Sequence, residues 1–239
     1  MPECKNCNAE VNHKYCSNCG HPAAVKRIDA HYITHEIEHI LHLERGIFYT
    51  IKEMMTKPGE SVRRFISEDR ARLVKPVIFI IITSLIYSLV NSFFHIEDGY
   101  VKYADAKPTT TGLIMKWIQN HYGYANIMMG VFIALWLKLF FRTYNYNFFE
   151  MLILLCFTIG MAMLIFTVFA IVQGATHIEL VEIGGYVGII YCAWAIGQFF
   201  DKRKWVNYLK ALGAYMLGMI TFFVLVMIAG SLVDVIWKH

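Results

Sequence analysis

The sequence predicts an all-α membrane protein, in which a bundle of five transmembrane helices follows a small zinc ribbon and cytoplasmic amphipathic helices. Composition is the first reason. Of the 239 residues, 57% are hydrophobic and only 17% are charged, against about 45–50% and about 25% in soluble domains. The second reason is that four of the six cysteines lie within the first 19 residues. These observations exclude a disordered chain and argue against a soluble cytosolic enzyme.

Two cysteine pairs near the N-terminus have the spacing of zinc ligands. Cys4 and Cys7 form one C-x-x-C pair, and Cys16 and Cys19 form a second pair eight residues later. Two tight turns of this kind can offer four thiolates to one ion. We therefore expect residues 1–24 to form a zinc ribbon, with a redox pair or unliganded thiols as the alternative. A closed four-sulfur shell has no open position for catalysis, so the expected Zn is structural.

Residues 25–75 are expected to form cytoplasmic or interfacial amphipathic helices. Within residues 31–55, apolar side chains recur with helical spacing and Gly46 interrupts the run. The apolar stripe comprises Ile33, Ile37, Ile40, Leu41, Ile47, Phe48, Ile51 and Met55. A second amphipathic stretch, residues 60–73, carries Val62, Phe65, Ile66 and Leu73 on one side and Arg63, Arg64, Arg70 and Arg72 as its charge. These arginines are expected to contact anionic headgroups or to enforce topology.

The HEIEH motif at residues 35–39 matches the H-E-x-x-H pattern of zinc hydrolases. In that pattern two histidines four residues apart hold zinc and the glutamate activates water. Here His35 and His39 would be the ligands, Glu36 the base, and His42 a third ligand. A solvated polar helix face and a non-catalytic metal or proton-responsive cluster are the alternatives. The motif's charged fourth residue favours the polar face, so no catalytic residue is predicted. Glu36 is the candidate if the motif is catalytic.

Residues 76–239 are expected to form the transmembrane domain. Five stretches approach the length of about 20 apolar residues that crosses a bilayer, and each has at most one charged residue, near an end. Because backbone groups in lipid must bond internally, these stretches are predicted to be helices. The expected spans are residues 76–94, 124–141, 149–173, 184–200 and 211–236.

Basic residues predict the orientation of the spans. Twelve of the 22 Lys and Arg residues precede residue 76, and four lie in residues 201–210, whereas residues 174–183 have none. The positive-inside rule then places the N-terminus in the cytoplasm and the C-terminus outside, in a multi-pass protein of the cytoplasmic membrane. Without an apolar signal segment before it, the first span is expected to act as the uncleaved targeting signal.

The span interiors bear on transport. Their central parts carry no charged side chain, which weighs against a proton-coupled or ion-coupled transporter. Interior hydroxyl groups are expected to bond to their own helices. The pairs Gly184-x-x-x-Gly188 and Ala214-x-x-x-Gly218 would permit close helix approach.

The order of these features resembles a family of uncharacterised bacterial polytopic inner-membrane proteins, classified as a domain of unknown function, that carry an N-terminal cytoplasmic zinc ribbon. The resemblance covers most of the chain and is strongest over residues 1–95. It implies the architecture above and no particular activity. The residues that carry it are Cys4, Cys7, Cys16 and Cys19, residues 34–50, Lys57-Pro58-Gly59 with Val62-Arg63, and residues 69–76.

The function expected from the sequence is that of a binding, scaffold or regulatory component at the cytoplasmic membrane. The ribbon would engage a cytoplasmic or membrane protein partner or a second copy of the chain, while the spans contact membrane lipids. Nucleic acid is not an expected partner, because Lys5 and Lys14 are offset by Glu3 and Glu10. A small-molecule or lipid transporter is the alternative, and a metal-dependent membrane hydrolase is the third hypothesis.

Overall fold

The structure is a computed structural model that describes residues 7, 10, 17–19, 46–70, 72–94, 96 and 109–236. The chain divides into two compact units, Met1–Glu44 and Arg45–His239. Among the described residues of the second unit, eight helices account for all the regular secondary structure. The predicted all-α class is confirmed for this part of the chain.

Five of these helices are long and apolar enough to cross a membrane, as the sequence predicts. The largest difference in bounds is at the last helix, which begins six residues before the predicted span. Its first turns contain Asn207 and Lys210, and polar residues in a helix escape a search for apolar stretches. The five are α4 (Pro76–Phe94), α6 (Tyr122–Phe140), α7 (Phe148–Thr176), α8 (Val181–Asp201) and α9 (Trp205–Ile236).

Local hydrogen bonds determine where α7 begins and ends. The Asn147 side chain accepts the Glu150 N–H, while the Glu150 carboxylate accepts the Asn147 N–H. This capping box satisfies two backbone donors that a helix start leaves unpaired. At the other end His177 adopts a left-handed conformation with φ of 58° and donates its N–H to the Gln173 carbonyl. This is a common way for a helix to end.

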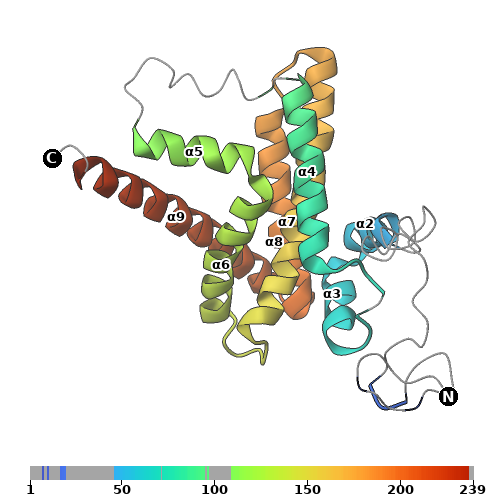
Figure 1. Ribbon diagram of the computed structural model, residues 1–239. Helices are drawn as coiled ribbons and strands as arrows, with labels where there is room; N and C mark the ends of the chain where they lie inside the picture. Colours follow the sequence, from blue (N-terminus) through green and yellow to red (C-terminus); the bar gives the residue numbers. More distant parts are fainter. Residues whose placement is uncertain are drawn as a thin grey trace. The chain divides into compact units, whose positions relative to one another are not determined.

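Small residues allow the spans to approach closely. α7 packs against α4, α6 and α8, and α9 packs against α6 and α8 (Figure 1). A Cβ atom on Gly218 of α9 would lie 2.5 Å from the Ile133 Cα of α6, and one on Gly184 of α8 would lie 2.9 Å from the Phe169 Cβ of α7. The two small-residue pairs in the sequence therefore do mark contacts between helices.

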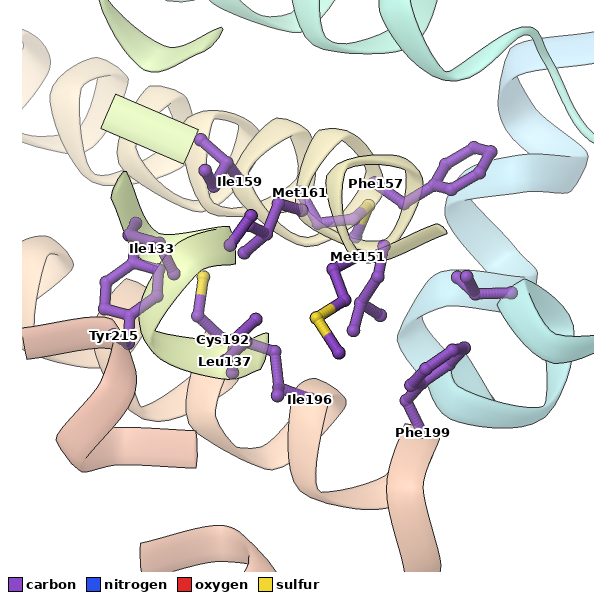
Figure 2. Packing of buried hydrophobic residues seen from close by; sticks show 14 of the residues in the cluster. Ile133, Leu137, Met151, Phe157, Ile159, Met161, Cys192, Ile196, Phe199 and Tyr215 are labelled. Atoms are coloured by element: carbon purple, nitrogen blue, oxygen red, sulfur yellow. The ribbon is translucent and has the colours of Figure 1, made fainter. Parts of the chain in front are cut away.

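The main core lies among α4, α6, α7, α8 and α9 and extends to the two short helices that precede α4. Figure 2 shows Leu137, Met151 and Ile196 among the side chains that fill it. Interior hydroxyl groups bond to their own helices, as expected: Thr83 to Phe79, Thr158 to Leu155, Thr167 to Met163 and Thr221 to Leu217, each through the carbonyl. Van der Waals packing and internally satisfied polar groups thus hold the bundle together.

Two short helices precede the first span, α2 (Gly46–Thr56) and α3 (Pro58–Ser67). The expected helical segment before Gly46 lies outside the described residues. Of the expected apolar stripe within α2, Ile47 and Ile51 pack against the core, whereas Phe48 and Met55 are 82% and 63% exposed. The fully buried residues of α2 are Gly46, Thr50 and Met54.

A helix that the sequence analysis did not predict, α5 (Thr110–Asn120), precedes the second span. The Thr109 side chain caps it by accepting the Gly112 N–H at 3.2 Å. The Thr110 N–H donates a hydrogen bond to the Asp234 carboxylate, near the far end of α9, at 2.8 Å. α5 accordingly lies beside α9 (Figure 1), and the Asp234 side chain joins the two helices.

Candidate functional site

The predicted metal ligands fall almost entirely outside the described residues. Of the four N-terminal cysteines, Cys7 and Cys19 are described, whereas Cys4 and Cys16 are not. The HEIEH motif and the third histidine, within residues 35–42, also lie outside the described part. The zinc ribbon and the second metal site therefore stay predictions from the sequence.

Arg63 fastens α3 to the end of α8. Its Nη1 donates to the backbone oxygens of Gln198 and Phe199, each at 2.6 Å. Both carbonyls belong to the last turn of α8, where a helix leaves its acceptors unpaired and a positive charge is favourable. Arg63 therefore has partners within the protein, and its expected contact with headgroups and role in topology stay predictions.

Gly59 lets α3 approach α8 backbone to backbone. A Cβ atom at this position would lie 2.4 Å from the Gln198 carbonyl carbon and 2.5 Å from the Phe199 nitrogen. Only glycine allows so short a separation. Pro58 is buried in the first turn of α3, where its missing N–H has no cost. Together with Arg63, this Pro-Gly pair forms a docking element between α3 and the bundle.

Hydrogen bonds tie α2 to the same end of the bundle. The Tyr191 hydroxyl of α8 donates to the Met54 carbonyl at 2.9 Å. The buried Thr50 hydroxyl donates to the Gly46 carbonyl and accepts the Val74 N–H at 3.1 Å. α2 and α3 are therefore integral to the helical unit, together with the start of α4.

Aromatic side chains join the segment between α6 and α7 to the last turn of α8. The rings of Phe141 and Phe200 stack with centroids 3.7 Å apart, and the Tyr146 ring lies 4.5 Å from that of Phe199. Burial raises the pKa of the Tyr146 phenol. The segment before α7 and the end of α8 thus form one continuous packed surface.

Exposed Lys and Arg side chains surround this surface, which we call the basic end. Arg72 donates to the Tyr49 hydroxyl at 2.6 Å, and this hydrogen bond raises the pKa of its guanidinium. The segment between α7 and α8, residues 177–180, carries Glu179 and no Lys or Arg. The basic end comprises the exposed side chains of Lys52, Lys57, Arg70, Arg72, Lys75, Lys138, Arg142, Lys202, Arg203, Lys204 and Lys210.

A cavity of about 230 Å³ lies among α5, α6, α7, α8 and α9. Its lining contains no Asp, Glu, Lys, Arg or His, and its polar side chains are Tyr122, Asn126 and Tyr215. Phe223 is 38% exposed, so a part of the lining lies at the outer surface of the bundle. The lining residues are Ile118, Tyr122, Ala125, Asn126, Met129, Ile159, Ala162, Met163, Phe166, Gly185, Gly188, Ile189, Tyr215, Met219, Phe222 and Phe223.

Sequence reasoning does not find this cavity. Its residues come from five helices, and apolar residues inside a span look alike in sequence whether they face lipid, protein or a void. Asn126 is the one signal that was present. It is an amide near the start of a predominantly apolar helix, and polar groups in spans often mark functional positions.

Comparison with known proteins gives a family match for one segment of the chain. No curated protein matches the chain significantly, and no solved structure does. Residues 44–88, which contain α2, the docking element and the first part of α4, match the model of a family described as a protein of unknown function, DUF3667. This segment is therefore similar to an uncharacterised domain family, and it contains the two short helices α2 and α3 at the basic end.

Proposed function

We propose that this protein is an integral membrane binding protein. It holds the hydrocarbon chain of a membrane lipid in the cavity among α5, α6, α7, α8 and α9. The apolar lining of that cavity carries the proposal. Binding pockets are concave, mostly apolar and equipped with a few polar groups, and this one has sixteen lining residues with no charge among them.

The size of the cavity supports a single chain as the ligand. An apolar cavity of about 150 Å³ can bind benzene, and drug-sized ligands occupy pockets of about 300–1,000 Å³. A volume of about 230 Å³ lies between these limits. It suits part of one hydrocarbon chain, whereas a whole two-chain lipid with its headgroup is too large.

The surroundings of the cavity support a lipid as the source of that chain. All but one of its walls belong to helices long and apolar enough to cross a membrane. Phe223 places part of the lining at the outer surface of the bundle, where a chain can enter sideways from the bilayer. Such a route needs no polar path through the protein.

The basic end supports an orientation for this binding protein. Its exposed Lys and Arg side chains would face the cytoplasm under the positive-inside rule, beside anionic headgroups that attract them. The N-terminal cysteine segment would then engage a partner from the cytoplasmic side, as the sequence predicts. The proposed activity is binding, and no chemical step is assigned to it.

A photo-crosslinking experiment tests the proposal. The full chain is placed in lipid nanodiscs with a phospholipid that carries a diazirine in one acyl chain, and labelled residues are mapped by mass spectrometry. Met129 and Met163, which line the cavity, are expected to be labelled. Met219→Trp fills the cavity and should abolish this labelling, because the added ring occupies the volume of the chain.

Met216→Trp is the matched control, since Met216 lies on the same helix with 37% of its surface exposed and does not line the cavity. It should leave labelling of Met129 and Met163 unchanged. Labelling confined to outward-facing residues such as Leu135, in every variant, would contradict the proposal.

A further inference from the structure

Asn126 is an unusual member of the cavity lining. It lies about one turn inside α6, a helix that is otherwise apolar over its first three turns, and is only 6% exposed. Burying an amide away from water is costly unless its hydrogen bonds are made. The hydrogen-bond partners of the Asn126 side chain therefore indicate which kind of ligand the cavity can bind.

The protein satisfies only a part of this amide. A carboxamide has two N–H donors and an oxygen with two lone pairs. Asn126 makes one bond, from Nδ2 to the Ser84 hydroxyl oxygen at 3.3 Å, and no other described residue bonds its side chain. That distance is long for an N–H···O bond, whose usual value is about 2.9–3.0 Å. Exchanging the positions of the amide nitrogen and oxygen leaves one of the two without a protein partner.

Other buried polar groups of the described helices contrast with Asn126. Asn207, which is 4% exposed, donates both to the Tyr144 hydroxyl and to the Asp201 carbonyl. Among the described residues, the fully enclosed side-chain polar atom without a partner is Asn91 Oδ1. The Asn126 oxygen is not enclosed in that way, so it is accessible from the cavity that its side chain lines.

We propose that the chain bound in the cavity carries a hydroxyl group, and that Asn126 recognises this hydroxyl. The inference rests on the proposed function. A hydroxyl donates one hydrogen bond and accepts others, so it can satisfy the amide oxygen and the second N–H together. A phosphate or an ammonium group would lack a counter-charge in a lining without ionised side chains. The ligand class is therefore a long-chain alcohol or another single-chain lipid with a free hydroxyl.

Water fits this position less well than a ligand hydroxyl. A buried water molecule needs about two to four polar partners. The Asn126 amide offers its oxygen and one N–H, which is the lower limit of what a buried water molecule needs. A hydroxyl that is attached to a chain is held additionally by the apolar walls.

The test compares two photoreactive probes of equal length, a diazirine-bearing primary alcohol and the corresponding alkane, with the full chain in nanodiscs. The wild-type protein should be labelled at Met129 and Met163 about fivefold more efficiently by the alcohol, which is the effect of one neutral hydrogen bond. Asn126→Leu, whose side chain has the same number and branching of heavy atoms but no polar group, should lower labelling by the alcohol to the level of the alkane. Labelling by the alkane should persist and show that the variant is folded.

Ser84→Ala is the matched control, because it removes the present partner of Asn126 and leaves the amide in place. It should keep the preference for the alcohol. Equal labelling of the wild type by both probes, or an unchanged preference in Asn126→Leu, would overturn the inference while Met219→Trp still abolished both signals. Labelling by both probes that persists in Met219→Trp would overturn the proposed function itself.

Discussion

Arg63 and Arg64 are adjacent in the chain but have different surroundings. The Arg63 guanidinium bonds to the Gln198 and Phe199 carbonyls at the end of α8. Arg64 forms an ion pair with Glu60 of its own helix at 2.8 Å, with both side chains more than a third exposed. Exposed pairs of this kind contribute about 0.3–0.5 kcal/mol, whereas hydrogen bonds from a charged group contribute about 1.5–3 kcal/mol.

This contrast predicts unequal effects of the same substitution. Arg63→Met should lower the free energy of unfolding by about 2 kcal/mol, because it leaves two carbonyls at the α8 terminus without their donor. Arg64→Met should lower it by at most about 0.5 kcal/mol. Reversible unfolding of the purified protein in mixed micelles measures both values. Equal losses in the two variants would show that Arg63 does not fasten α3 to α8.

At the scale of an element, α5 depends on a residue more than a hundred positions away. The Asp234 carboxylate binds the Thr110 N–H, one of the donors that the start of a helix leaves unpaired. A negative charge also interacts favourably with the helix N-terminus. Ile118 of the same helix lines the cavity, so the position of α5 contributes to the shape of the candidate site.

Removing this carboxylate should loosen the start of α5. We expect Asp234→Ala to accelerate hydrogen exchange at the amides of residues 110–113, while the amides of α7 exchange as before. Ser231→Ala is the control, because the Ser231 hydroxyl bonds only within α9, to the Met227 carbonyl. If exchange in α5 is the same in both variants, Asp234 does not hold the helix in place.

At the scale of the whole molecule, the two ends of the helical unit differ in charge. The basic end gathers exposed Lys and Arg from α2, from the segment between α3 and α4, and from the segments around the ends of α6 and α8. The described connection between α7 and α8 carries Glu179 and no Lys or Arg. Such an asymmetry orients a multi-pass protein in its membrane.

The proposed orientation can be measured with single cysteine substitutions in intact cells. Glu179→Cys should react with an impermeant thiol reagent from outside, since the α7–α8 connection would face away from the cytoplasm. Arg203→Cys should react only after the cells are made permeable. Labelling of Arg203→Cys in intact cells would reverse the orientation and the predicted cytoplasmic position of the basic end.

The sequence alone determined the helical class, the number of candidate spans and the bounds of α4. These depend on composition and on runs of about 20 apolar residues, and each backbone hydrogen bond of a helix forms within its own segment. Gly184 and Gly218 were also found in advance as points of close approach. The zinc ligands Cys4, Cys7, Cys16 and Cys19 stay a sequence prediction, because spacing indicates them and the described residues do not test them.

Only the tertiary structure decided what depends on distant segments. Arg63 bonds to carbonyls 135 and 136 positions further along the chain, a contact that its place in an amphipathic stretch does not indicate. α5 escaped the sequence analysis because part of its N-terminal cap is supplied by Asp234. The cavity could not be foreseen, because a void is the space left when five helices pack, and no single segment encodes that space. Asn126 can be recognised as polar in the sequence, but only the packing of the surrounding helices shows that its side chain makes a single hydrogen bond to the described residues.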